Sequence, residues 1–127
     1  MRTRHLNWLL IVANLLISTT TLYAQRQQQN VAKLKADARN AVGMIGADKA
    51  KTQTYCQIID RARQINDAVA KKDQKKAMAL AQEMVQLRNQ LPEFIVLSRV
   101  VNQVDLNSPD GREIASVIAS LNQSCPE

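Results

Sequence analysis

The fold is decided by residues 48–91, which read DKAKTQTYCQIIDRARQINDAVAKKDQKKAMALAQEMVQLRNQL. Apolar residues recur in this stretch every three or four positions, which is the spacing of one helix face, and no strand-like alternation competes with it. Asp48 and Asp73 each precede such a run, and a carboxylate at that place caps a helix by accepting a backbone N–H. The stretch therefore predicts two helices, about 49–70 and 74–91. Because the turn between them is short, they are expected to pack antiparallel.

Each of these two helices carries an apolar face that is expected to build the core. The first face consists of Tyr55, Ile58, Ile59, Ala62, Ile65 and Val69, and the second of Ala77, Leu80, Ala81, Met84, Leu87 and Leu91, widened by Met78 and Val85. Core filling is also the expected role of Met44, Met78 and Met84. An adaptable binding groove lined by these thioethers is the alternative.

Three further helices are predicted around this pair. One covers about 28–45 and ends at Gly46, with fraying expected over Gln25–Asn30. The others cover about 92–104 and 109–122, since Pro92 and Pro109 suit a first helical turn and Ser108 is a good cap. The fold class is therefore all-α, a small antiparallel helical bundle of four to five helices. The segment 25–46 has a narrow, alanine-rich face, so it is expected to dock more loosely than the bundle of residues 47–127.

Residues 1–24 have the pattern of a cleaved secretory signal peptide. The pattern consists of Arg2 and Arg4 at the start, an apolar run over Trp8–Ile17, and Ala24 before Gln25. An uncleaved membrane anchor is the alternative, but the run is far shorter than the ~20 residues that a spanning helix needs. We expect cleavage between Ala24 and Gln25 and a periplasmic or extracellular location. The remaining 103 residues suit one domain.

Cys56 and Cys125 are the only two cysteines of the chain. In a small exported domain two cysteines are expected to form a structural disulfide. A redox-active pair is the alternative, but such pairs usually stand close together, as in C-x-x-C. A bridge across this separation stabilises the fold by at most about 4 kcal/mol.

The composition of the processed chain excludes several kinds of chemistry. Loss of the leader removes His5, the only histidine, so Ser-His-Asp and Cys-His catalysis are excluded and a zinc site loses its commonest nitrogen ligand. The stretch Asp105–Gly111 only hints at a calcium loop, because Pro109 occupies a ligand position; a turn followed by a helix cap is favoured. Solvated helix positions are expected for Glu83, Glu93 and Glu113. We therefore expect no enzyme, no cofactor and no metal site.

The charge of the processed chain is mildly positive. Removal of Arg2 and Arg4 from the 17 basic residues leaves 15 against 11 acidic residues, a net charge of +4. The lysines are interleaved with acids, which favours solvated faces; weak contact with an anionic membrane surface is the sharper alternative. Tyr55 and Phe94 are the only aromatic rings left, too few for a platform that stacks nucleic-acid bases. The expected partner is an unknown protein or another envelope component, and not nucleic acid.

Several local sequences resemble those of a known group of proteins. They are Asp48–Cys56, the turn Lys71–Asp73, Asn107-Ser108 followed by Gly111–Ile114, and the cysteine near the end. Together they resemble short exported helical proteins of Gram-negative bacteria whose function is uncharacterised, over most of residues 47–125. The resemblance implies an exported helical fold and transfers no functional residue. A looser similarity to small periplasmic acid-stress chaperones rests on size, compartment and the number of cysteines.

The expected function is thus an exported, non-enzymatic helical module that serves interaction or structure in the cell envelope. The alternative is a periplasmic holdase that responds to acid stress. Without histidine, such a response depends on carboxyl groups, which titrate at about pH 3 to 4.5.

Overall fold

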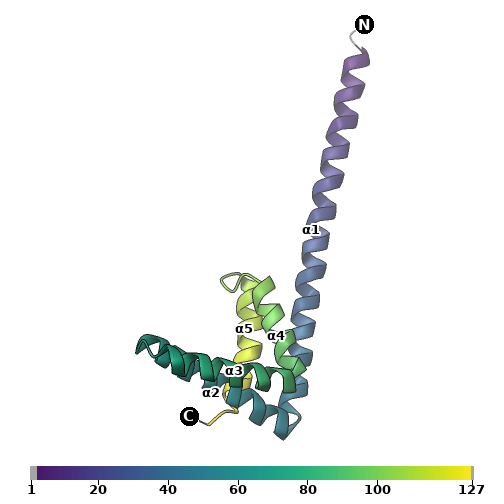
Figure 1. Ribbon diagram of the computed structural model, residues 1–127. Coiled ribbons are helices and arrows are strands. Elements are labelled where there is room, and N and C mark those ends of the chain that lie inside the picture. Colours follow the sequence, from purple (N-terminus) through teal and green to yellow (C-terminus); the bar gives the residue numbers. More distant parts are fainter. Residues whose placement is uncertain (1–2, 127) are drawn as a thin grey trace. The chain divides into compact units, whose positions relative to one another are not determined.

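Figure 1 shows the computed structural model of the chain, which describes the backbone of residues 3–126 and the side chains of residues 22–126. Five helices follow one another: α1 (Thr3–Gly46), α2 (Lys49–Ala70), α3 (Gln74–Gln90), α4 (Pro92–Gln103) and α5 (Pro109–Asn122). The described residues contain no strand. The predicted all-α fold is confirmed. Within the described part of the chain, no helix combines the length and the hydropathy that crossing a membrane requires.

The chain divides into two compact units, one up to Lys33 and the other from Leu34 onward. The boundary lies inside α1, whereas the sequence predicts it after residue 46. The reason is that Ala38, Ala41 and Ile45 are buried in the same core as residues of the later helices. Small side chains allow close approach of a helix, so an alanine-rich face can still be a well-packed one.

The start of α1 differs from the prediction. The helix includes Gln25–Asn30, where fraying was expected, although all six of these residues are exposed. Gln and Arg are good helix formers, and extension of an existing helix needs no new nucleus, so no packing is required to keep this segment helical. The side chains of the predicted signal peptide lie outside the described residues as far as residue 21.

Helix boundaries after residue 47 follow the predicted caps. The Asp48 carboxylate accepts from the N–H groups of Ala50 at 2.8 Å and Lys51 at 3.1 Å. Asp73 accepts from the backbone of Lys76 at 3.0 Å, and Ser108 Oγ accepts from Gly111 at 3.0 Å. These bonds satisfy N–H groups that have no partner within the helix, and each predicted start is confirmed.

The core of the second unit lies where α1, α2, α4 and α5 meet. Its largest fully buried side chains are Tyr55, Ile45, Ile58, Leu91, Ile114 and Val100. The Tyr55 hydroxyl donates to Asn122 Oδ1 at 2.8 Å, so the buried ring keeps a partner for its polar end. Its centroid lies 6.2 Å from that of Phe94, with a tilt of 55° between the rings. The ring pair therefore links α2 to α4, and the hydrogen bond of the Tyr55 hydroxyl links α2 to α5.

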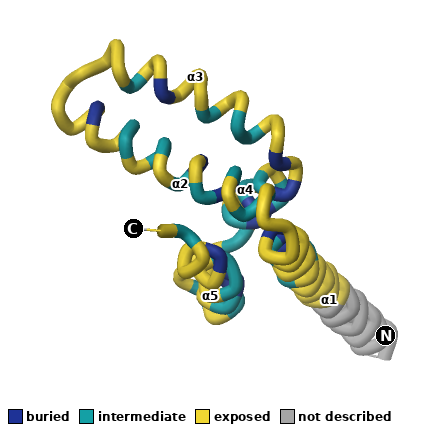
Figure 2. Tube along the Cα trace, turned by 90° about the horizontal axis from the view of Figure 1, so that it is seen from below, coloured by how far each residue is buried: buried dark blue, intermediate teal, exposed yellow. Residues whose placement is uncertain are grey.

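Helices α2 and α3 form an antiparallel hairpin whose turn lies away from α4 and α5 in both views (Figures 1 and 2). Figure 2 shows mainly exposed residues around this turn. Val69, Met78 and Val85 are 62%, 67% and 56% exposed, so their expected place in the core is wrong. Met44, with 53% of its surface exposed, is a further correction, whereas Met84 is half-buried. Among the described residues, the hairpin packs against the other helices at the end far from this turn, so part of its apolar faces stays uncovered.

Candidate functional site

The disulfide joins α2 to the segment after α5. Cys56 and Cys125 are bonded, with an S–S distance of 1.99 Å and a Cα–Cα distance of 5.3 Å. Both are half-buried and pack against the hydrophobic core. The bond therefore holds the C-terminal segment against the first half of α2, at the end of the hairpin that is far from its turn.

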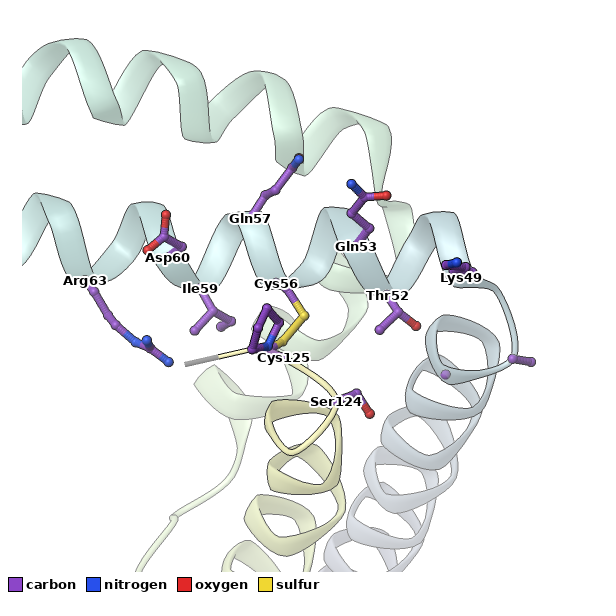
Figure 3. A pocket seen from close by; sticks show the side chains of 13 residues that line it. Lys49, Thr52, Gln53, Cys56, Gln57, Ile59, Asp60, Arg63, Ser124 and Cys125 are labelled. Carbon is purple, nitrogen blue, oxygen red and sulfur yellow. A yellow bond between two sulfur atoms is a disulfide. The ribbon is translucent and has the colours of Figure 1, made fainter.

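An open groove of about 1110 Å³ lies beside this disulfide, between α2 and the C-terminal segment (Figure 3). In Figure 3 the side chains of Ile59 and Arg63 point from α2 toward the C-terminal segment, and Gln53 and Gln57 point to the other side of the helix. The lining residues thus cover much of the circumference of α2. They do not converge on one point, as the groups of a catalytic site do.

The polar groups of the groove are partly engaged within the fold and partly exposed. The Asp60 carboxylate accepts from Gln64 at 2.7 Å and from Arg61 at 3.2 Å, so it is engaged within its own helix. The Thr52 hydroxyl donates to the carbonyl oxygen of Ile45 at 2.8 Å, which ties the start of α2 to the end of α1. Among the described lining residues, Lys49 and Arg63 remain as exposed charges.

A cluster of ion pairs joins α1 to α5. The Lys35 ammonium lies 2.7 Å from Asp110 and 2.6 Å from Glu113, and Arg39 also contacts Glu113. The hydrogen bond from Lys35 lowers the pKa of the Glu113 carboxyl below its usual 4.5. Hydrogen bonds to Asp110 and Glu113 raise the pKa of Lys35 above 10.5. These charges hold α1 against the start of α5 as long as the carboxyl groups are ionised.

A second ion pair is buried between α2 and α4. Glu93 is only 8% exposed, and its Oε1 atom accepts from the Lys51 ammonium. The hydrogen bond from Lys51 is the main reason why the pKa of Glu93 is lowered. Its other oxygen, Oε2, has no hydrogen-bond partner among the described residues. The expectation of a solvated Glu93 is wrong.

The sequence did contain a signal for this burial. Glu93 precedes Leu97 by four and Val100 by seven residues, and both of these are buried. This spacing places Glu93 on the core face of α4, but a face predicted from apolar residues alone leaves a charged residue out. The partners Lys51, Lys35 and Arg39 are 42 to 78 residues away from the carboxylates they bind, so local patterns cannot reveal them.

The far end of the hairpin carries a different set of side chains, and we call residues Val69–Met78 the hairpin tip. Every residue of the tip except the half-buried Ala77 is exposed. It contains Lys71, Lys72, Lys75 and Lys76 against a single acid, Asp73. The four ammonium groups form no ion pair or side-chain hydrogen bond with any described residue. Even when the nearby Asp67 is included, the local net charge stays positive.

The turn of the tip closes α2 in a Schellman motif. The N–H of Lys72 donates to the carbonyl of Val69 at 3.0 Å, and that of Asp73 to the carbonyl of Ala68 at 2.8 Å. This motif requires a left-handed residue, and Lys72 takes that conformation with φ of 58°. Glycine is the usual residue there because it has no Cβ to clash. Lys72 therefore stands at a position where any side chain costs stability.

The stretch Asp105–Gly111 has the turn structure that its sequence favours. The Asp105 carboxylate accepts from the N–H of Asn107 at 2.9 Å, and Ser108 caps α5. Among the residues that the structure describes, no three acidic, cysteine or histidine side chains are placed to hold a metal ion together.

Comparisons with protein families, with curated proteins and with solved structures gave no match.

Proposed function

We propose that the protein is an exported, non-enzymatic helical module of the cell envelope, and that the hairpin tip is its interaction surface. Residues 1–24 serve as the signal peptide in this proposal, and the disulfide forms after export. One observation carries it: the tip combines exposed Val69 and Met78 with four lysines that have no partner in the described structure. Exposed apolar side chains beside unpaired charges are features of a surface that contacts a partner.

The export step is tested on protein recovered from cells that secrete it. Mass spectrometry is expected to find an N-terminus at Gln25 and a mass that alkylating reagents do not change until the disulfide is reduced. An intact N-terminus with two free thiols, found in the cytoplasm, contradicts export. This measurement is independent of any partner.

The interaction surface is tested by a photo-crosslinking residue placed at Met78 in the exporting cell. Ala119, an exposed residue on α5, is the matched control position. Adducts are expected from position 78 and not from position 119. Equal labelling at both positions, or labelling at neither, argues against the tip as an interaction surface.

A second candidate function, an acid-responsive holdase, is supported by the ion pairs. Glu93 and Glu113 link α1 and α2 to α4 and α5, and both carboxyl groups have lowered pKa values because of these links. Protonation removes the links and leaves a strongly positive chain that repels itself, which favours opening of the bundle. Circular dichroism and aggregation of a client protein are measured from about pH 7 to about pH 2. Opening without protection of the client excludes this function.

A further inference from the structure

We infer that the hairpin tip docks onto an anionic membrane surface, with its lysines at the lipid headgroups and Val69 and Met78 in the headgroup–acyl boundary. The inference rests on the proposed function and names the partner of the tip. Its first support is charge complementarity, because Lys71, Lys72, Lys75 and Lys76 are exposed and without ion pairs among the described residues. The four cations lie within six residues of the chain, and a negative surface attracts such a cluster.

The second support is the mixture of charge and apolar surface at the tip. Val69 lies in the last turn of α2 and Met78 in the second turn of α3, so both flank the lysine cluster. They are more than 60% exposed, which no contact within the described chain compensates. Amphipathic elements at a membrane surface pair basic residues with apolar ones in this way. A nucleic acid, or an acidic polypeptide without apolar side chains, satisfies the lysines but gives the two apolar side chains no comparable environment.

The third support is the conformation of Lys72. Its left-handed backbone disfavours any side chain, yet a lysine stands where glycine closes the helix at lower cost. The turn therefore gives up stability for an additional positive charge at the outermost part of the hairpin. A membrane surface, which meets the tip end-on, makes use of a charge at that place.

A second charged surface of this unit offers a contrast. Lys49 and Arg63 line the groove beside the disulfide, and no exposed large apolar side chain accompanies them there. Arg61 is engaged by Glu83 at 2.8 Å and by Asp60 at 3.2 Å. Unpaired cations next to exposed apolar side chains are thus combined at the tip.

Co-sedimentation with vesicles tests the inference directly. The exported, oxidised protein is mixed with vesicles of phosphatidylcholine that contain about 30% phosphatidylglycerol, and with vesicles of phosphatidylcholine alone. Each basic residue near an anionic surface strengthens binding about fivefold. The quadruple variant K71Q/K72Q/K75Q/K76Q is therefore expected to bind about 600-fold more weakly. Raising the salt concentration from about 0.02 M to about 0.3 M is expected to release the unmodified protein.

A charge-matched variant provides the control. R26Q/K49Q/R63Q/R99Q removes four exposed cations that lie outside the tip, so its net charge equals that of the tip variant. It is expected to keep most of the binding. An equal loss in both variants means that net charge alone attracts the protein, and this result overturns the inference. Thermal melting of both variants verifies that the exposed substitutions leave the fold intact.

A fluorescent reporter tests insertion separately from charge. The chain after residue 24 has no tryptophan, so V69W supplies a single reporter at the tip, and I95W, at a 41% exposed site on α4, is its control. Anionic vesicles are expected to shift the emission of V69W to shorter wavelength and to leave I95W unchanged. The shift is measured again with excess polyglutamate, which is expected not to reproduce it. A reproduced shift identifies an acidic polypeptide as the better partner and overturns the lipid assignment.

The outcomes separate this inference from the proposed function. Absence of binding to anionic vesicles at low salt, or equal binding to neutral vesicles, overturns the membrane inference. If position 78 still forms adducts in cells, the tip remains an interaction surface for a protein. If neither vesicles nor crosslinking engage the tip, the inference and the proposed function both fail.

Discussion

The two ends of the α2–α3 hairpin differ in what surrounds them. At one end, the stapled core, Tyr55 and Ile58 are buried among residues of α1, α4 and α5, and Cys56 is bonded to the C-terminal segment. At the other end, the hairpin tip, α2 and α3 contact only each other, and the tip is exposed. The buried residues Ala68 and Leu80 near the tip are not part of the core cluster. The contacts that stabilise the fold are thus concentrated at the stapled core, and the side chains of the hairpin tip are available to contact other molecules.

Of the changes that test this difference between the two ends, removal of the disulfide is expected to have the largest effect on stability. Its cysteines are 69 residues apart, and opening a loop of that length costs about 4 kcal/mol of unfolding free energy in the chain-entropy estimate. The double variant C56S/C125S is expected to lose close to that amount in urea unfolding. Identical urea midpoints with and without dithiothreitol contradict a stabilising role. The reduced protein that remains folded is expected to bind anionic vesicles as before, because the tip does not depend on the bridge.

Acid is expected to have the next largest effect, because it breaks the ion pairs of Glu93 and Glu113 together. Glu93 and Glu113 have folded-state pKa values below 4.5, so their pairs contribute stability above that pH, and the contribution is lost as the pH falls through the lowered values. Urea midpoints are expected to be constant at mildly acidic to neutral pH and to decrease below pH 4.5. The variant E93Q/E113Q is expected to be less stable at neutral pH and to show a shallower decrease. If the urea midpoint of this variant decreases as steeply with pH as that of the unmodified protein, carboxyl groups other than Glu93 and Glu113 cause the acid effect.

Two glycines provide a matched pair with effects of opposite sign. A Cβ on Gly111 meets the carbonyl oxygen of Asp105 at 2.0 Å and the Cα of Leu106 at 2.7 Å, and backbone atoms cannot move aside as a side chain does. G111A is therefore expected to cost about 2 kcal/mol or more. A Cβ on Gly43 meets nothing within 4 Å, so G43A is expected to gain about 0.8 kcal/mol from helix propensity. Equal stability of the two variants in urea contradicts this account of how α5 starts.

The turn of the tip is expected to respond in the opposite direction from the core. Lys72 is left-handed, and K72G is expected to raise the unfolding free energy by about 1 kcal/mol. The same substitution removes a tip cation, so vesicle binding is expected to weaken about fivefold. K71G is the control, because Lys71 has negative φ and glycine there is expected to lower stability. Parallel changes in stability and binding contradict a trade-off at this turn.

The sequence allows this fold to be predicted where local chemistry decides it. Asp48, Asp73, Ser108 and the prolines at positions 92 and 109 act within one turn of their own helices, so the starts of α2 to α5 agree with the prediction. The pairing of Cys56 with Cys125 follows from there being only two cysteines in the sequence.

Burial of individual side chains was less predictable, because it depends on which helix faces pack against other helices. Met78 and Val85 continue an apolar pattern on α3, but α3 contacts mainly α2 and, to a smaller extent, α4, and both residues remain exposed. Glu93 is charged, yet its position on the core face of α4 buries it once Lys51 supplies a counter-ion. The hairpin tip is visible in the sequence as a lysine cluster. Its exposed apolar residues and unpaired charges become apparent only when the helices are placed.

The smallest effect on stability is expected at the exposed apolar residues, and it tests the comparison most directly. Met78 and Val85 lie seven residues apart on one face of α3, so M78S and V85S are each expected to change the unfolding free energy by less than about 0.5 kcal/mol. Leu80 is only 7% exposed, and L80S is expected to cost about 3 kcal/mol, because it leaves a cavity and buries a hydroxyl. Urea unfolding of the three variants measures the difference. A cost for M78S that approaches that of L80S means that the tip is packed in solution, and the side chain is then unavailable to a membrane. A negligible cost combined with weaker vesicle binding means that Met78 serves contact with a partner and contributes little to the fold.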